Sequence, residues 1–270
     1  MPIDLQDLLA TAAARELMAI VAGGEWLLAL DADHLGRAAR VGDGPSAPAS
    51  VGVLKLHGAI TPRGSYGMEG WVSKLNSLAA NPDVAAIVID GDTPGGTVAG
   101  TQEAADAVKA ATKVKPVYAI ADTLSASAGY WIMSQASQFW ATPSAEVGSI
   151  GAMGLHVSIA KALEDAGIKA TIVKSSKFKA ERSPLGELSP EAQSYLQSSV
   201  DEAHSAFVKA VAEGRKVSRD KVANDFGQGR VMSAPAALKA GMIDHIGTMS
   251  DLMASLRTKT GTVRRRASIF

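Results

Sequence analysis

The segment VAAIVIDGDTPGG, from Val84 to Gly96, decides the fold predicted for this chain. Its first half, Val84 to Ile89, is a near-continuous apolar run, which is typical of a parallel strand buried on both faces of a sheet. Its second half ends in Pro-Gly-Gly, which is a turn signal. The segment therefore predicts a central parallel strand whose carboxyl end runs into a tight turn, where open α/β sheets bind their ligands.

Strand-like and helix-like runs alternate on both sides of this segment. The alternation predicts an α/β fold with a largely parallel sheet, surrounding helices and right-handed crossovers. The predicted strands are residues 51–56, 84–89, 116–120, 138–141 and 170–173, and the predicted helices are residues 71–80, 100–112, 128–136, 158–166, 190–214, 218–226 and 234–240.

The two ends of the chain differ from this alternating region. Leu5 to Ile20 has alanine and leucine at helical spacing, and Gly42 to Ser50 is rich in turn-forming residues. We therefore expect a helical extension and linker over residues 1–50 and the main domain over residues 51–250. Residues 251–270 are expected to hold a helix end and a solvated basic tail, Arg264 to Arg266.

The composition excludes several classes of function. Lys plus Arg and Asp plus Glu each number 27, so the formal net charge is zero and no general basic field favours nucleic acid as a partner. The absence of cysteine excludes disulfides and thiolate catalysis. The five histidines are dispersed without ligand spacing, so we predict no metal and no cofactor.

The N-terminal region lacks the pattern of a secretory signal, since acidic residues interrupt its apolar positions. No apolar run approaches the ~20 residues that a membrane span requires. We therefore expect a protein without a membrane span, located in the cytoplasm.

A candidate nucleophile stands where the strand predicted at residues 116–120 gives way to the next helix. Ser127 lies in the small-residue run Ser125-Ala126-Ser127-Ala128-Gly129. A serine hydroxyl is a poor nucleophile near neutral pH, so it requires a base and a site that binds the developing anion. The backbone N–H of Ala128 could serve that anion site. The alternative is that Ser125 or Ser127 only caps the helix, and Ser125 is the second candidate nucleophile.

Two other segments supply the remaining parts of a serine hydrolase that works without histidine. Gly95 and Gly96 are free to adopt backbone angles that turn an N–H toward a substrate carbonyl, although a simple tight turn is the alternative. Downstream, one of three closely spaced lysines could act as a general base if it is shielded from water and neutral. These candidates are Lys174, Lys177 and Lys179, which precede Ser183-Pro184.

Taken together, these motifs resemble those of peptidase family S49, which includes signal peptide peptidase A and the head-maturation proteases of tailed phages. The resemblance covers roughly Val51 to Thr248 and implies the ClpP/crotonase-like superhelical fold. The motifs that carry it are Asp92 to Gly96, Ala126 to Trp131, Gly148 to Gly151, and a lysine four residues before Ser183-Pro184.

The resemblance implies a role for each candidate. Ser127 becomes the nucleophile, and Lys179 becomes the base because only this lysine has the family's spacing to Ser-Pro. The implied oxyanion hole consists of Gly96 as the main donor, Gly95 and Ala128. Ser149 either orients the lysine amine or is a turn serine.

The function that the resemblance implies is that of a serine endopeptidase with a Ser-Lys dyad. The absence of an expected membrane span favours the phage branch, whose members mature proheads by cleaving scaffold and capsid proteins. The alternatives are a signal-peptide-peptidase-like bacterial protease, a crotonase-type acyl-CoA enzyme and a non-catalytic assembly scaffold. Because relatives form rings, we also expect a homo-oligomer, in which Ser127 and Lys179 could come from different subunits.

Overall fold

The structure is a computed structural model that describes residues 50–64 and 67–257. The predicted N-terminal helix, the linker before Ser50 and the basic tail lie outside the described residues. The described residues fall into two compact units. Ala152–Ala203 belong to the first, which we call the lysine-bearing unit, and the described residues up to Gly151 and from His204 belong to the second, which we call the sheet unit.

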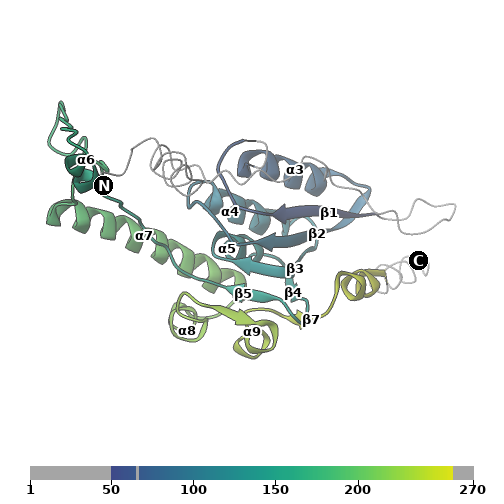
Figure 1. The fold of residues 1–270 in the computed structure, drawn as a ribbon. Coiled ribbons are helices and arrows are strands. Elements are labelled where there is room, and N and C mark those ends of the chain that lie inside the picture. Colours follow the sequence, from purple (N-terminus) through teal and green to yellow (C-terminus); the bar gives the residue numbers. More distant parts are fainter. Residues whose placement is uncertain (1–49, 65–66, 258–270) are drawn as a thin grey trace, which may run out of the picture. The chain divides into compact units, whose positions relative to one another are not determined.

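A seven-stranded sheet forms the centre of the sheet unit (Figure 1). The strand order is β1-β2-β3-β4-β7, and β5 pairs with both β3 and β6. All pairs are parallel except β5 with β6. The strands are β1 (Ser50–His57), β2 (Val84–Thr93), β3 (Val117–Ala126), β4 (Gln138–Ala141), β5 (Glu146–Gly148), β6 (Val231–Ser233) and β7 (His245–Ile246).

Helices surround this sheet and continue into the lysine-bearing unit. Their bounds are α3 (Met68–Ala80), α4 (Thr101–Ala111), α5 (Ala128–Met133), α6 (Ala160–Asp165), α7 (Pro190–Arg215), α8 (Arg219–Asp225) and α9 (Ala234–Ala240), and residues 249–257 are also helical. No helix in the described part of the chain is long and apolar enough to cross a membrane.

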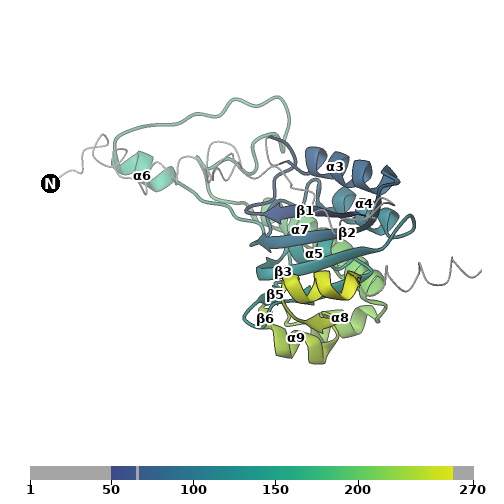
Figure 2. The same cartoon turned by 90° about the vertical axis from the view of Figure 1, so that its right-hand side faces the viewer.

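Strand β2 is buried on both faces, as its sequence predicts. Ile87 and Ile89 belong to the core cluster that includes residues of α3, α4 and α5. Val88 belongs to a second cluster with Leu252 and Leu256, from the helix over residues 249–257. Figure 2 shows this helix in yellow, in front of the sheet. Burial of alternate residues on opposite faces explains why the whole strand is apolar.

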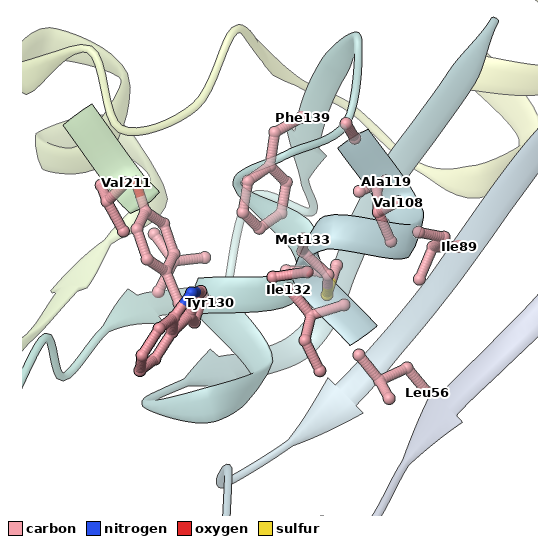
Figure 3. Close-up of a cluster of buried hydrophobic side chains, with 14 of the residues drawn as sticks. Leu56, Ile89, Val108, Ala119, Tyr130, Ile132, Met133, Phe139 and Val211 are labelled. Carbon is pink, nitrogen blue, oxygen red and sulfur yellow. The ribbon is translucent and has the colours of Figure 1, made fainter. Parts of the chain in front are cut away.

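The short helix α5 is embedded in the larger core cluster, and every one of its residues is buried. Figure 3 shows its side chains Tyr130, Ile132 and Met133 gathered with Leu56, Ile89, Val108 and Phe139. The Tyr130 hydroxyl donates a hydrogen bond of 2.9 Å to the Met242 carbonyl. Burial strongly raises the pKa of the Tyr130 phenol, which therefore stays neutral.

A partly buried ion pair, with the Asp244 side chain 34% exposed, fixes the end of α7 to the strand edge beside β7. Arg215, whose side chain is 6% exposed, donates to both carboxylate oxygens of Asp244, at 2.9 Å and 2.6 Å. Asp244 also accepts the Phe139 N–H at 2.7 Å. Burial alone would raise the pKa of Asp244, but these hydrogen bonds outweigh it and hold the pKa below its ordinary value.

The predicted α/β class with a largely parallel sheet is confirmed, and most predicted elements occur within a few residues of their expected bounds. One prediction is wrong: residues 170–173 form no strand. They are apolar in part, but they lie in the lysine-bearing unit, where the described residues provide no strand to pair with. The predicted helix over 158–166 is confined to α6, and the short strands β5, β6 and β7 were not predicted.

Candidate active site

Three neighbouring strands end at the same edge of the sheet, and each is followed by a residue that the sequence singles out. Strand β3 pairs with β2 on one side and with β5 on the other, all in parallel. Gly95 and Gly96 therefore follow β2, Ser127 follows β3, and Ser149 follows β5. The carboxyl ends of adjacent parallel strands thus bring these segments together within the sheet unit.

Ser127 has a strained backbone at the junction of β3 and α5. Its φ of 53° and ψ of −124° are rare for a residue with a side chain. The Ser127 N–H donates to the Gly148 carbonyl at 2.8 Å, and its carbonyl accepts the Trp131 N–H at 3.0 Å. Such bonds over-determine the strained conformation, and a serine on a sharp strand-to-helix turn is a recurring arrangement for nucleophiles.

The two capping alternatives are wrong. Ser127 occupies the N-cap position of α5, but its side chain makes no capping hydrogen bond. Ser125 is fully buried, and its hydroxyl lies 3.2 Å from the Met133 sulfur. Ser127 is partly exposed. Only Ser127 of the two therefore offers a hydroxyl to a substrate.

The turn after β2 packs directly against Ser127. Gly95 has a φ of 95°, and a β-carbon placed there would lie 2.6 Å from the Ser127 β-carbon and 2.9 Å from the Ala128 nitrogen. A β-carbon on Gly96 would lie 2.0 Å from the Ile60 carbonyl oxygen. Neither contact is possible for a side chain, so both positions require glycine for the close approach of backbone to backbone.

The N–H groups of the two glycines have different surroundings. Gly95 is buried, and its N–H donates to the Thr93 hydroxyl at 3.0 Å. Gly96 is exposed and forms a parallel bridge with Ile60. That bridge uses the Gly95 carbonyl and the Thr97 N–H, at 2.8 Å and 3.0 Å from Ile60, and leaves the Gly96 N–H out.

Ala128 and Ser149 complete this edge. Ala128 is the first residue of α5 and is 4% exposed. Ser149 shares the unusual backbone of Ser127, with a φ of 54°, and its N–H donates to the Arg230 carbonyl at 2.9 Å. Two serines with positive φ thus follow adjacent parallel strands.

Lys179 lies in the other compact unit. It is exposed and sits in a turn, where its N–H donates to the Ser176 carbonyl at 3.3 Å. Within the described part of the lysine-bearing unit, Lys179 therefore lacks the shielding from water that a lysine base requires. The structure brings Ser127, Gly95, Gly96, Ala128 and Ser149 together, and it assigns Lys179 to the lysine-bearing unit.

The two competing lysines are held by local contacts. The Lys174 amine donates to the Lys177 carbonyl at 2.8 Å. The Lys177 amine pairs with Glu191 at 2.9 Å and lies 4.6 Å from the centre of the Phe178 ring. Among the described residues, the Lys179 amine has no comparable hydrogen bond, which leaves it the freest of the three.

Three of the described histidines make local contacts or are exposed. His57 pairs with Asp90 at 3.4 Å, the His156 ring lies 3.0 Å from the Gly186 carbonyl, and His204 is exposed on α7. In residues 50–64 and 67–257, no three acidic or histidine side chains gather to hold a metal ion.

Sequence comparison assigns the chain to a family. The profile described as "Peptidase family S49" matches residues 109–262, which is more than half of the chain and includes Ser127, Ser149 and Lys179. The chain therefore belongs to peptidase family S49. The turn at Gly95 and Gly96 lies just before the matched region.

Named relatives include both viral and cellular proteins. The chain is 30% identical to "Capsid assembly protease C" of Escherichia phage lambda over 81% of this chain and 51% of the relative. It is 31% identical to "Protease 4" of Salmonella typhi over 76% of this chain and 34% of the relative. "Head-tail preconnector protein GP5" of Enterobacteria phage P21 is 30% identical, over 77% of this chain and 43% of that protein. The chain thus spans between about a third and a half of these relatives' lengths.

Among solved structures, a mutant of the "1510-N membrane-bound stomatin-specific protease" matches with a TM-score of 0.47 and 19% identity, over 77% of this chain and 84% of that chain.

Proposed function

We propose that this chain is a serine endopeptidase in which Ser127 is the nucleophile and Lys179 the general base. The observation that carries the proposal is the strained, uncapped Ser127, packed against a glycine turn whose Gly96 N–H is left out of the sheet pairing. Membership of peptidase family S49 supports the reaction class.

In the proposed reaction, the Ser127 Oγ attacks the carbonyl carbon of the scissile peptide while its proton passes to the neutral Lys179 amine. The N–H groups of Gly96 and Ala128 donate to the oxyanion of the tetrahedral intermediate. The protonated amine then gives its proton to the leaving nitrogen. Water, activated by Lys179, hydrolyses the ester on Ser127, and Ser149 is proposed to orient the lysine amine.

A fluorophosphonate probe tests the nucleophile, because it phosphonylates an activated serine and not an ordinary surface one. We expect labelling and peptide cleavage by the wild type and neither by Ser127→Ala. Ser125→Ala is the matched control and should still be labelled. Labelling that persists in Ser127→Ala would refute the assignment. Complete absence of labelling would instead favour the acyl-CoA enzyme or the non-catalytic scaffold.

We further propose that a second copy of the chain covers the lysine-bearing unit and that the dyad forms between subunits. This unit exposes large apolar side chains, and α6 buries none of its residues. Large exposed apolar surfaces mark interaction sites. The most exposed examples are Met153 at 93%, Val173 at 94%, Leu155 at 63% and Tyr195 at 61%. A head-to-tail contact of this kind closes into a ring when its rotation permits.

Mixing two inactive variants tests this arrangement. Ser127→Ala and Lys179→Ala proteins should together recover part of the activity, since some mixed interfaces contain both intact residues. No recovery, despite subunit exchange demonstrated by mass spectrometry, would place both residues in one subunit. A fully active monomer in light scattering would refute the oligomer itself.

The biological role that we propose is prohead maturation by cleavage of scaffold and capsid proteins, in the host cytoplasm and inside the assembling particle. Two phage relatives, named for capsid assembly and for the head-tail preconnector, support it at 30% identity each. The similarity to the cellular Protease 4 supports the alternative of a bacterial protease, for which we propose signal peptides as the substrate.

The two roles are separated by introducing Ser127→Ala into the genome that encodes the chain. The maturation role predicts particles that contain uncleaved capsid or scaffold protein, measured by intact mass. Normal particles together with undegraded signal peptides in the membrane fraction would favour the alternative.

A further inference from the structure

Thr93 lies at the end of β2, outside the residues that the motifs assign to chemistry, and its side chain is fully buried. Its hydroxyl donates to the Gly58 carbonyl at 2.6 Å and accepts the Gly95 N–H at 3.0 Å. A single hydroxyl thus relays a hydrogen bond from the glycine turn to the loop after β1. Each bond in such a chain polarises the next one.

The methyl group of Thr93 contacts the other half of the site. A β-carbon on Gly129, the second residue of α5, would lie 2.3 Å from the Thr93 Cγ2. Thr93 also pairs in register with Ser125, two residues before Ser127. The Thr93 side chain therefore contacts the turn at Gly95 through its oxygen and helix α5 through its methyl group.

The relay engages the Gly95 N–H, whereas the Gly96 N–H has no part in the bridge to Ile60. Because the Gly95 N–H donates to Thr93, the peptide plane between Pro94 and Gly95 is fixed. The Gly95 carbonyl belongs to the next peptide, the one between Gly95 and Gly96, and accepts the Ile60 N–H at 2.8 Å. That peptide also carries the exposed Gly96 N–H. Without the hydroxyl, the buried Gly95 N–H and the part-buried Gly58 carbonyl would both lose this partner, and this cost favours rotation of the turn.

We propose that Thr93 is the positioning residue of the oxyanion hole: it holds the Gly95 N–H inward so that, of the two glycine N–H groups in the turn, only that of Gly96 faces the substrate carbonyl beside Ser127. This inference rests on the proposed peptidase function and adds to it, because it assigns the turn's donor role to Gly96 and a purely structural role to the Gly95 N–H.

Two nearly isosteric variants separate the hydroxyl from the methyl group. Thr93→Val keeps the shape of the side chain and removes the hydroxyl that relays the hydrogen bond. We expect kcat for peptide cleavage to fall at least about ten-fold while KM changes little, because the oxyanion forms in the transition state and not in the bound substrate. Thr93→Ser keeps the relay and should retain kcat within about three-fold. Ser134→Ala is the stability control, because it deletes another fully buried hydroxyl, at the opposite end of α5, and should leave kcat unchanged.

Amide hydrogen exchange on the wild type tests the same idea without a variant. The Gly95 amide should exchange slowly and the Gly96 amide quickly. This exchange measurement and the kcat of Thr93→Ser test the positioning role of Thr93 even if Thr93→Val does not fold. Fast exchange at Gly95, or a Thr93→Val enzyme as active as the wild type, would overturn the positioning role while leaving the peptidase proposal intact. If the wild type neither cleaves peptides nor reacts with the fluorophosphonate probe, and so behaves as Ser127→Ala is expected to behave, the proposed function and the positioning role are both refuted.

Discussion

The two proposed partners of the dyad have opposite surroundings. Ser127 begins α5, a helix whose residues are all buried, and its backbone is held by bonds to β5 and to its own helix. Lys179 is an exposed turn residue in a unit whose helix α6 buries nothing. The comparison teaches that the segments proposed to bind the oxyanion are held by hydrogen bonds within the sheet unit, whereas the proposed base is exposed in the described part of the lysine-bearing unit. The proposed mechanism therefore requires a surface that covers Lys179.

The largest effect is expected at Lys179, where the exposed half of the site would lose its base. Lys179→Ala should lower kcat at least about 10³-fold, and Lys179→Arg should not restore it, because arginine does not deprotonate in proteins. Steady-state peptide cleavage measures both. Lys177→Ala is the matched control and should remain active, since that amine is already paired with Glu191. Near wild-type cleavage by Lys179→Ala would assign the base elsewhere.

In the sheet unit, the ion pair between Arg215 and Asp244 should carry a large share of the stability. Asp244→Asn leaves the Arg215 charge buried and uncompensated, so the free energy of unfolding should fall by about 3–5 kcal/mol. Urea denaturation measures this loss. An unchanged midpoint would show that solvent reaches the pair freely.

The same pair gives a pH dependence of defined sign. The pKa of Asp244 is lower in the folded chain than in the unfolded one. The carboxylate therefore contributes fully to the free energy of unfolding at pH values above its unfolded pKa of about 3.9. This contribution is lost as the pH falls below the unfolded pKa and through the lower pKa of the folded chain. Wild-type stability should therefore decline with acidification below about pH 4 more steeply than that of Asp244→Asn.

The exposed apolar side chains should affect assembly rather than folding. Val173→Asp should change the free energy of unfolding by no more than about 0.5 kcal/mol, because Val173 is 94% exposed. It should weaken self-association, measured by sedimentation velocity. Ser176→Asp adds the same charge at a nearby exposed polar position and serves as the control. Equal association of wild type and Val173→Asp would remove Val173 from the proposed interface.

A small effect is also expected at a surface ion pair between α4 and α7, the helix that carries Arg215. Lys109 and Glu213 lie 2.5 Å apart, but each side chain is 44% exposed. The hydrogen bond from Lys109 lowers the pKa of Glu213, yet water screens the pair. Glu213→Gln should cost at most about 1 kcal/mol by urea denaturation. A loss as large as that of Asp244→Asn would contradict the contrast between buried and exposed pairs.

The sequence by itself determined the α/β class, most of the strands and helices, and the order of the motifs. Local patterns suffice for these features: an apolar run such as Val84 to Ile89 requires burial on both faces, and the periodicity of residues 190–214 requires a helix. The family resemblance, carried by the same motifs, agrees with the profile match.

Only the tertiary structure decided between neighbours of the same residue type. Ser125 and Ser127 are both small and polar, but Ser125 lies within β3 and is fully buried, whereas Ser127 lies in the turn after β3 and is partly exposed. Gly95 and Gly96 differ because one donates to Thr93 and the other does not. The error at residues 170–173 has the same origin, since a strand exists only through hydrogen bonds to a partner. Such pairings join residues far apart in the chain, so no local pattern in the sequence encodes them.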